Sequence, residues 1–341
     1  MTATYKIISE SDYAETFDQK SAFALDVLVG LSEQRKRIPS KYLYDAVGSE
    51  LFRRITKQPE YYVTNCEMEI LENGIGSIAS YVKNEPFNLV ELGAGFGRKT
   101  AILIDYFLTQ QLDFRYVPID ISEAAMKELS ESMAERFPDV EMSGLVSDYF
   151  SGLKWLNNRY GQRNFVLFLG SSIGNFTHVQ ALVFLRNMWN CLSHGDYALI
   201  GFDLKKDIEL LLQAYNDSQG ITRAFNMNLL ERINRELGGE FDFDAFRHFG
   251  TFDLFSGGME SYLVSLKRQS VYIDMIGRSF ELEPWEPIHT EYSYKYLISD
   301  IEKLASESGF VIDQHILDSR QYFADSILRV SKPEYEQEHK S

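Results

Sequence analysis

The stretch Asn88-Leu89-Val90-Glu91-Leu92-Gly93-Ala94-Gly95-Phe96-Gly97-Arg98-Lys99-Thr100 decides the fold of this chain. An apolar run ends in a carboxylate and a glycine-rich turn, and a helical pattern follows through Ile102, Leu103, Tyr106 and Phe107. This order predicts a buried parallel strand that leads into a helix across a loop with little side-chain bulk. Glycines in such a loop let the backbone approach a ligand closely.

A second apolar run, Tyr116–Ile119, follows about one strand later and ends in Asp120. An acid at the end of this second strand suits the cis-diol of a ribose, because a carboxylate can accept hydrogen bonds from both hydroxyls. The glycine loop and this acid together predict a site for a nucleoside cofactor.

Two cofactors compete for that site. A dinucleotide site has the pattern G-x-G-x-x-G, whereas this chain has Arg98 in place of the third glycine. Glu91 precedes the loop directly, where it would repel a pyrophosphate but could accept hydrogen bonds from a cationic amino-acid tail. The sequence therefore favours S-adenosylmethionine over NAD.

Apolar runs and helical patterns alternate through the middle of the chain. Together with the helical patterns 100–110, 122–136 and 178–191, the strand-like runs predict a doubly wound, Rossmann-like α/β sheet. The strand-like runs are 88–91, 116–119, 140–147, 164–169 and 197–202, and 310–317 and 327–330 follow as closing strands after a helix over 293–308.

The segment between these parts has a different pattern, with helix formers over 207–233 and alternating strands over 262–266 and 270–276. The first sixty residues look mostly helical. We therefore expect an S-adenosylmethionine-binding domain over 63–205 and 287–335. Residues 1–62 and 206–286 are expected to form a second, smaller α+β domain that binds the substrate.

Composition excludes several classes of function. The chain has 341 residues and a formal charge of −16, so most of its surface would repel a polyanionic nucleic acid. Its two cysteines, Cys66 and Cys191, and its six scattered histidines show no metal-ligand spacing. No apolar run approaches membrane-spanning length. We expect a soluble, cytoplasmic monomer that binds no metal and acts on a small molecule.

The fourth strand-like run is followed by the small-residue turn Gly170-Ser171-Ser172-Ile173-Gly174-Asn175. An asparagine offers both a donor and an acceptor, which suits the carboxylate or amine of an amino acid. The alternative is a plain strand-to-helix turn in which Asn175 caps the following helix.

Five ordered motifs resemble the histidine Nα-methyltransferase family, which makes trimethylhistidine, the precursor of ergothioneine. The resemblance extends over about residues 35 to 330. The motifs are Lys41-Tyr42-Leu43-Tyr44-Asp45-Ala46-Val47-Gly48-Ser49-Glu50-Leu51-Phe52, Pro59-Glu60-Tyr61-Tyr62, Glu91-Leu92-Gly93-Ala94-Gly95, Phe168-Leu169-Gly170-Ser171-Ser172-Ile173-Gly174-Asn175 and Thr290-Glu291-Tyr292-Ser293-Tyr294-Lys295-Tyr296.

The resemblance implies a role for each matched position. Asn175 and Tyr215 would hold the substrate carboxylate, Glu291 and Ser293 the imidazole, and Tyr44 would orient the amine for catalysis. The cofactor contacts would be Tyr61, Gly93, Lys99, Asp120, Asp148 and Tyr149, beside Glu91 and Gly95 from the loop pattern. The substrate contacts would be Tyr44, Phe52, Tyr61, Gly170, Asn175, Tyr215, Ser261, Glu291 and Ser293.

One departure from the family pattern concerns specificity. Ser261 stands where the family often has a methionine against the ring. Methylation of tyrosine or tryptophan at the α-amine therefore remains an alternative. Two alternative functions belong to other classes of protein. Arg98 and Glu91 disfavour a dinucleotide-dependent oxidoreductase. The complete set of polar pocket residues disfavours an inactive cofactor-binding module.

Overall fold

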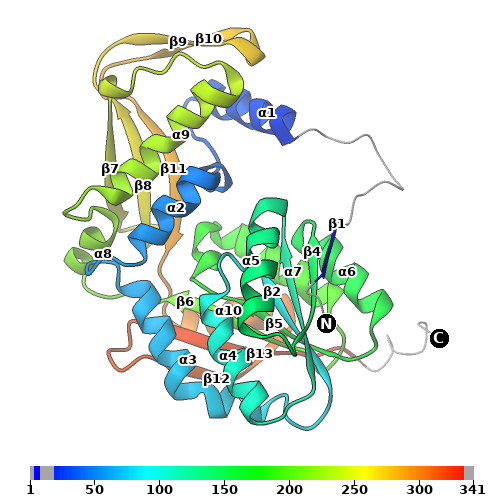
Figure 1. Ribbon diagram of the computed structural model, residues 1–341. Helices are drawn as coiled ribbons and strands as arrows, with labels where there is room; N and C mark the ends of the chain where they lie inside the picture. Colours follow the sequence, from blue (N-terminus) through cyan, green and yellow to red (C-terminus); the bar gives the residue numbers. More distant parts are fainter. Residues whose placement is uncertain (1–3, 8–18, 334–341) are drawn as a thin grey trace. The chain divides into compact units, whose positions relative to one another are not determined.

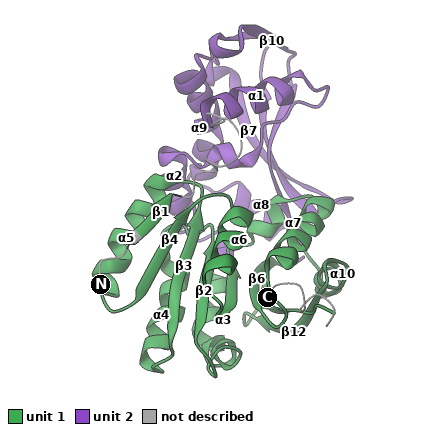
Figure 2. Cartoon of the chain, turned by 90° about the vertical axis from the view of Figure 1, so that its right-hand side faces the viewer, with its two compact units in different colours: residues 1–10, 65–204, 296–341 green, residues 11–64, 205–295 purple. Residues whose placement is uncertain are grey.

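The computed structural model describes residues 4–7 and 19–333, and these divide into two compact units (Figures 1 and 2). Of the described residues, unit 1 comprises 4–7, 65–204 and 296–333, and unit 2 comprises 19–64 and 205–295. The chain therefore passes from one unit to the other more than once.

Unit 1 is built on one large, mostly parallel sheet (Figure 2). At one edge of the sheet, the two outermost strands run antiparallel to each other. The inner strand of these two also runs antiparallel to the next strand of the sheet. In spatial order the strands are β1 (Thr4–Ile7), β4 (Glu141–Val146), β3 (Phe114–Asp120), β2 (Phe87–Leu92), β5 (Arg163–Phe168), β6 (Tyr197–Asp203), β13 (Phe323–Val330) and β12 (Phe310–Leu317).

Helices join the parallel strands and cover the sheet. Three of them contribute to one buried apolar cluster with β2 and β3, namely α3 (Tyr62–Ser80), α4 (Arg98–Thr109) and α5 (Glu123–Arg136). The other three pack against one another through α7 (His178–Cys191), which contacts both α6 (Tyr149–Arg159) and α10 (Ile298–Ser308). The architecture confirms the predicted doubly wound, Rossmann-like α/β fold.

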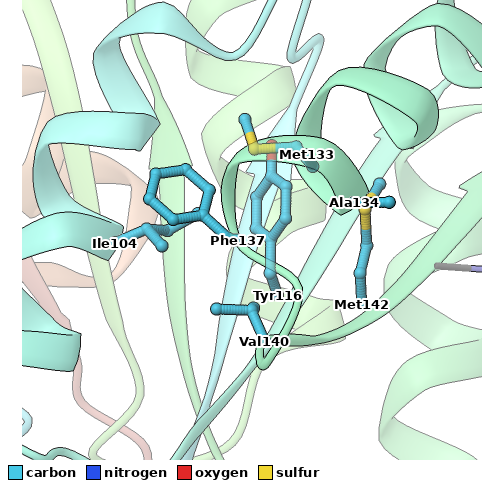
Figure 3. A pocket seen from close by; sticks show the side chains of 7 residues that line it. All are labelled: Ile104, Tyr116, Met133, Ala134, Phe137, Val140 and Met142. Atoms are coloured by element: carbon cyan, nitrogen blue, oxygen red, sulfur yellow. The ribbon is translucent and has the colours of Figure 1, made fainter. Parts of the chain in front are cut away.

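A small apolar cavity lies within the buried layer between β3, β4 and the neighbouring helices (Figure 3). Tyr116, Met133, Phe137 and Met142 are among its lining residues. The wall contains almost no polar groups, so this cavity has the character of a packing defect rather than a ligand site.

Unit 2 is a smaller α+β arrangement. Its three-stranded antiparallel sheet has the order β11 (Pro287–Tyr294), β8 (Gly258–Ser265) and β7 (Phe246–Asp253), and a separate hairpin pairs β9 (Gln269–Ile273) with β10 (Arg278–Leu282). The helical elements are α1 (Gln19–Ser32), η1 (Ser40–Leu43), α2 (Ala46–Ile55), α8 (Ile208–Tyr215) and α9 (Ile221–Leu237), with the short turns η3 (Phe243–Ala245) and η4 (Asp274–Ile276).

Several helix boundaries follow from local chemistry. Ser122 accepts a hydrogen bond from the Ala125 N–H and caps α5, as its position in the sequence indicates. Gly238 ends α9 in the left-handed conformation, at φ 66°. Thr177 and Gln180 form a capping box at the start of α7.

Some expectations were wrong. The described part of the first sixty residues is mostly helical as expected, but strand β1, which pairs with β4 at the edge of the sheet, was not expected. The helix expected over 293–308 begins only at Ile298, and its first residues belong to β11. Strand β7 and helix α6 were not anticipated.

The division into units also differs from the expected domain ranges. β11 pairs with β8, so residues 287–295 group with unit 2 rather than with the large sheet. Residues 4–7 group with unit 1 for the corresponding reason. Residues 1–3, 8–18 and 334–335 of the expected ranges lie outside the described residues.

Candidate functional site

The glycine loop of unit 1 lies where the carboxyl ends of the parallel strands meet. The strand order reverses direction beside β2 and β5, and in such sheets the ligand crevice lies outside the carboxyl ends of the strands at this point. Gly95 has φ 52°, and a side chain added there would meet no atom within 4 Å. The loop therefore exposes bare backbone at the edge expected for a cofactor.

Two further predicted cofactor residues lie close to this loop. The Tyr149 hydroxyl would be 2.7 Å from a Cβ atom on Gly93. Burial, and after it the charge of Asp120, raises the pKa of Tyr149 to about 12. Burial likewise raises the pKa of Asp120, against the hydrogen bond that its Oδ1 accepts from the Ser122 N–H at 2.9 Å. The structure thus groups Gly93, Asp120 and Tyr149.

Asp148 and Glu91 have structural partners. One oxygen of Asp148 accepts the N–H groups of Phe150 and Ser151, so this residue is the N-cap of α6. The buried Glu91 accepts the Tyr116 hydroxyl at 2.5 Å. Burial raises the pKa of Glu91 to about 7, although hydroxyl hydrogen bonds and Lys99 oppose this rise.

Lys99 belongs to a charged cluster that the sequence did not reveal. Its ammonium forms an ion pair with Glu67 of α3, which is fully buried. The other Glu67 oxygen accepts the Gly170 N–H at 2.7 Å. The cluster therefore joins the helix after the glycine loop to the turn after β5. Glu67 lies in an ordinary helical pattern, so no local signal marks it.

Asp325 of β13 adds a second buried carboxyl to this cluster. It is paired in register with Gly201, and a Cβ atom on Gly201 would lie 2.4 Å from the Glu67 Oε1 atom. Burial, and next the charge of Glu67, raises the pKa of Asp325 well above its ordinary value, while Lys99 acts against this rise.

The turn from Gly170 to Asn175 is held by contacts from two elements, α3 and β6. Besides the Glu67 contact to Gly170, the Ser171 hydroxyl accepts the Asp203 N–H at 3.0 Å. Ser171 has φ 56°, an uncommon conformation for a residue with a side chain. The alternative role of Asn175 as a helix cap is wrong, because the N-cap of α7 is Thr177.

Four predicted substrate residues form an aromatic cluster within unit 2. Tyr44 is 5.5 Å from Phe52 between ring centroids, and Phe225 is 5.3 Å from Tyr44. Tyr61 extends the cluster toward Tyr215 at 6.5 Å. Phe225 is a member that sequence reasoning missed, because one apolar residue in α9 looks like ordinary core.

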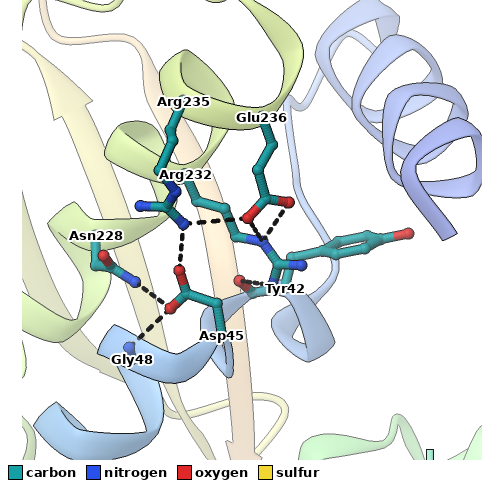
Figure 4. Close-up of polar contacts among 7 residues, drawn as sticks. All are labelled: Tyr42, Asp45, Gly48, Asn228, Arg232, Arg235 and Glu236. Carbon is teal, nitrogen blue, oxygen red and sulfur yellow. Dashed lines mark hydrogen bonds and ion pairs between the residues drawn. The ribbon is translucent and has the colours of Figure 1, made fainter. Parts of the chain in front are cut away.

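Polar contacts between α2 and α9 fix the start of this cluster (Figure 4). Asp45, the residue after Tyr44, accepts the Gly48 N–H and the Asn228 amide, both at 2.7 Å. Asp45 also pairs with Arg235, and Arg232 donates to the Tyr42 carbonyl at 3.0 Å. The backbone on both sides of Tyr44 is therefore held against α9.

The remaining substrate residues share one face of the unit 2 sheet. Glu291 is opposite Ser261 and Ser293 is opposite Met259 in the β11–β8 register, so all four side chains point the same way. Ser261, Ser293 and Met259 are buried, and Glu291 is partly buried. Burial raises the pKa of Glu291 to about 7, although the charge of Lys295 lowers it.

Tyr215 and Lys295 meet Ser293 on this face. The Tyr215 hydroxyl donates to the Ser293 oxygen at 2.6 Å. The Lys295 ammonium donates to the Tyr215 oxygen at 2.9 Å and to the Ser293 oxygen at 2.8 Å. Lys295 is only 3% exposed, and sequence reasoning gave it no role.

Metal and membrane features complete the description. Within 4–7 and 19–333, no three or more His, Cys, Asp or Glu side chains lie close enough together to hold a metal ion. The helices in the same residues include none with the length and apolar character required to cross a membrane.

The doubly wound sheet, the glycine loop and the strand-end acid define a nucleoside-cofactor protein of the Rossmann-like α/β class. The family model described as histidine-specific, S-adenosylmethionine-dependent methyltransferase matches residues 23–330. The chain belongs to this family, and S-adenosylmethionine is its cofactor.

Relatives with established names support the same family. The histidine N-alpha-methyltransferase of Mycolicibacterium smegmatis is 33% identical over 89% of this chain and 93% of its own length. The histidine N-alpha-methyltransferase of Mycobacterium tuberculosis is 37% identical over 81% of this chain and 84% of its own length. The ergothioneine biosynthesis protein 1 of Schizosaccharomyces pombe is 30% identical over 84% of this chain and 39% of its own length.

Proposed function

We propose that the protein transfers methyl groups from S-adenosylmethionine to the α-amino group of L-histidine. The product would be Nα,Nα,Nα-trimethylhistidine, the precursor of ergothioneine. The observation that carries the substrate assignment is the pair Glu291 and Ser293, a carboxyl and a hydroxyl side by side on one face of β11. Such a pair offers an acceptor and a donor to the two nitrogens of an imidazole.

The residues of unit 1 fit the cofactor chemically. The open space over Gly95 admits a ligand close to the backbone, and Asp120 presents a carboxyl for the ribose hydroxyls. Tyr149 lies beside Gly93 of the same loop, and the charge of Asp120 acts on it. When bound, the cofactor supplies an electrophilic methyl group, so these residues need only bind and orient it.

The remaining polar residues are assigned to the amino-acid backbone of the substrate. We propose that Asn175 and Tyr215 hold its carboxylate, with Gly170 in the adjoining turn. Tyr44 would orient the amine, which must be neutral to attack. The aromatic faces of Tyr44, Phe52 and Tyr61 would favour the amine as it becomes a permanent cation.

Incubation with S-adenosylmethionine and each of the twenty amino acids, with products read by mass, tests the proposal. We expect one to three added methyl groups on histidine. A competition reaction with histidine, tyrosine and tryptophan tests the effect of Ser261. Preferential methylation of tyrosine or tryptophan would overturn the histidine assignment and leave the methyltransferase class intact.

Two further reactions separate the site assignments. Histamine lacks the carboxylate, so it should be methylated far more slowly than histidine if Asn175 has the proposed role. Asn175→Ala should raise the KM for histidine and leave cofactor affinity unchanged. We propose the cytoplasm as the compartment.

A further inference from the structure

The contacts of Lys295 involve two proposed substrate residues at once. Its ammonium donates to Tyr215 and to Ser293, and those two hydroxyls are hydrogen-bonded to each other. Its backbone N–H donates to the Gly257 carbonyl at 3.1 Å, which fixes the start of the side chain. A lysine buried this completely is uncommon in a protein interior unless its charge is compensated.

The contact of the Lys295 ammonium with Ser293 restricts what the serine hydroxyl can do. A serine hydroxyl has one proton and two acceptor lone pairs, and a lysine ammonium can only donate. The Lys295 ammonium donates to the Ser293 oxygen, and it does so whether the Tyr215 proton points to Ser293 or to the substrate carboxylate. The Ser293 proton therefore remains available, and Ser293 can donate to an acceptor that lies beside it.

The same ammonium acts on the neighbouring acceptor. Glu291 lies two residues before Ser293 on the same face of β11, and Lys295 is the charged group that favours its ionised form. Burial opposes this effect, and Glu291 is restricted to accepting hydrogen bonds only in its ionised form. With Glu291 ionised, the site offers one acceptor and one donor, which matches a neutral imidazole with one N–H and one bare nitrogen.

We propose that Lys295 is a positioning and specificity-determining residue, which fixes Ser293 as a donor and Glu291 as an acceptor so that the site binds the neutral ring of histidine. The inference rests on the proposed function, because the ring-end roles of Glu291 and Ser293 come from it. Lys295 itself acts through these two residues.

Other titratable groups near this face have different surroundings. His248 of β7 is buried, and burial lowers its pKa to about 4, with Asp217 and Arg223 as its charged neighbours. Glu260, Tyr262, His289 and Tyr292 point to the opposite face of the sheet, according to the β11–β8 register. On Glu291, burial and Lys295 are the two influences that set the pKa.

The test is the pH profile of kcat/KM for histidine in Lys295→Met. Loss of the ammonium should raise the pKa of Glu291 further, so the acid limb of the profile should move to higher pH. The pKa of free histidine is the same for both proteins, so a shift between them reports the enzyme. At neutral pH we expect a KM for histidine about tenfold or more above the wild-type value, from the loss of charge-assisted hydrogen bonds.

Three comparison variants separate this role from a structural one. Lys295→Arg keeps the charge and should retain the position of the acid limb. Lys295→Gln keeps a hydrogen-bond donor without the charge, so the acid limb of its pH profile should move to higher pH. If Lys295→Met does not fold, Lys295→Gln takes its place in the test. Lys267→Met removes an exposed lysine of the same unit and should leave the profile unchanged.

The outcomes are distinct. An unshifted limb with unchanged preference for histidine in both Lys295→Met and Lys295→Gln would overturn the inference. Equal loss of kcat/KM at every pH, without a shift, would assign Lys295 a structural role and overturn it as well. Wild-type protein that does not methylate histidine would instead overturn the proposed function, which the first measurement of the series reveals.

Discussion

At the scale of single residues, position within a strand separates functional acids from ordinary ones. Asp113 and Asp120 flank the same strand, β3, at its two ends. Asp113 is exposed at the amino end, whereas Asp120 is partly buried at the carboxyl end beside Gly93 and Tyr149. Since the ligand edge of a parallel sheet is its carboxyl edge, only Asp120 is placed to meet a cofactor.

Replacement of Asp120 by alanine should therefore weaken cofactor binding by about 1.5–3 kcal/mol, the usual cost of losing a hydrogen bond to a charged group. Calorimetric titration with S-adenosylmethionine measures this directly. Asp113→Ala is the matched control and should bind normally. Equal affinities for the two variants would contradict the role of Asp120.

At the scale of the loop and its helix, two glycines have different surroundings. Both Gly95 and Gly97 have positive φ, at 52° and 64°. A Cβ atom on Gly97 would lie 2.2 Å from the Met133 methyl and 2.6 Å from a Leu129 methyl, whereas one on Gly95 would meet nothing. Gly97 is therefore required for packing, and Gly95 is available for a ligand.

Alanine substitutions should separate these two requirements. Gly97→Ala should lower the free energy of unfolding by about 2–4 kcal/mol, because left-handed strain and overpacking add. Gly95→Ala should cost only about 1–2 kcal/mol for the strain, yet it should reduce cofactor affinity more. Urea unfolding and calorimetry measure both quantities. Normal cofactor binding by Gly95→Ala would show that the open space is not used.

At the scale of the whole molecule, the buried carboxyl groups of unit 1 make the stability of the folded state depend on pH. Glu67 and Asp325 share the surroundings of a single lysine, Lys99, inside unit 1. The pKa of Asp325 in the folded protein is raised well above its ordinary value of 3.8. The folded state thus binds this proton more tightly than the unfolded chain, and the associated stability is present at low pH and lost as the pH rises through the folded-state pKa.

Asp325→Asn should remove that loss, because asparagine is neutral at every pH. The variant should gain thermal stability relative to wild type as the pH is raised from about 5 to 8. Thermal unfolding at both pH values provides the measurement, with the exposed Asp139→Asn as a control for loss of a surface carboxyl. A stability difference that does not change with pH would contradict the assignment.

The amino-acid sequence by itself determined the strands β2, β3, β5 and β6 and the helices α4, α5 and α7. These features depend on short-range periodicity and on turn chemistry, which neighbouring residues supply. The family motifs added the roles of the site residues. Those roles remain predictions, although the structure groups Gly93 with Asp120 and Tyr149, and Tyr44 with Phe52.

Only the tertiary structure decided the features that depend on distant partners. β11 was expected partly as a helix because its inner face has Glu291 and Ser293, polar residues that interrupt an apolar alternation. β7 was missed for a related reason, since His248 and Gly250 occupy its inner positions. The contacts of Glu67 with Gly170 and of Lys295 with Tyr215 join residues far apart in the chain. Such pairings leave no local pattern, because the fold alone brings their members within hydrogen-bonding distance.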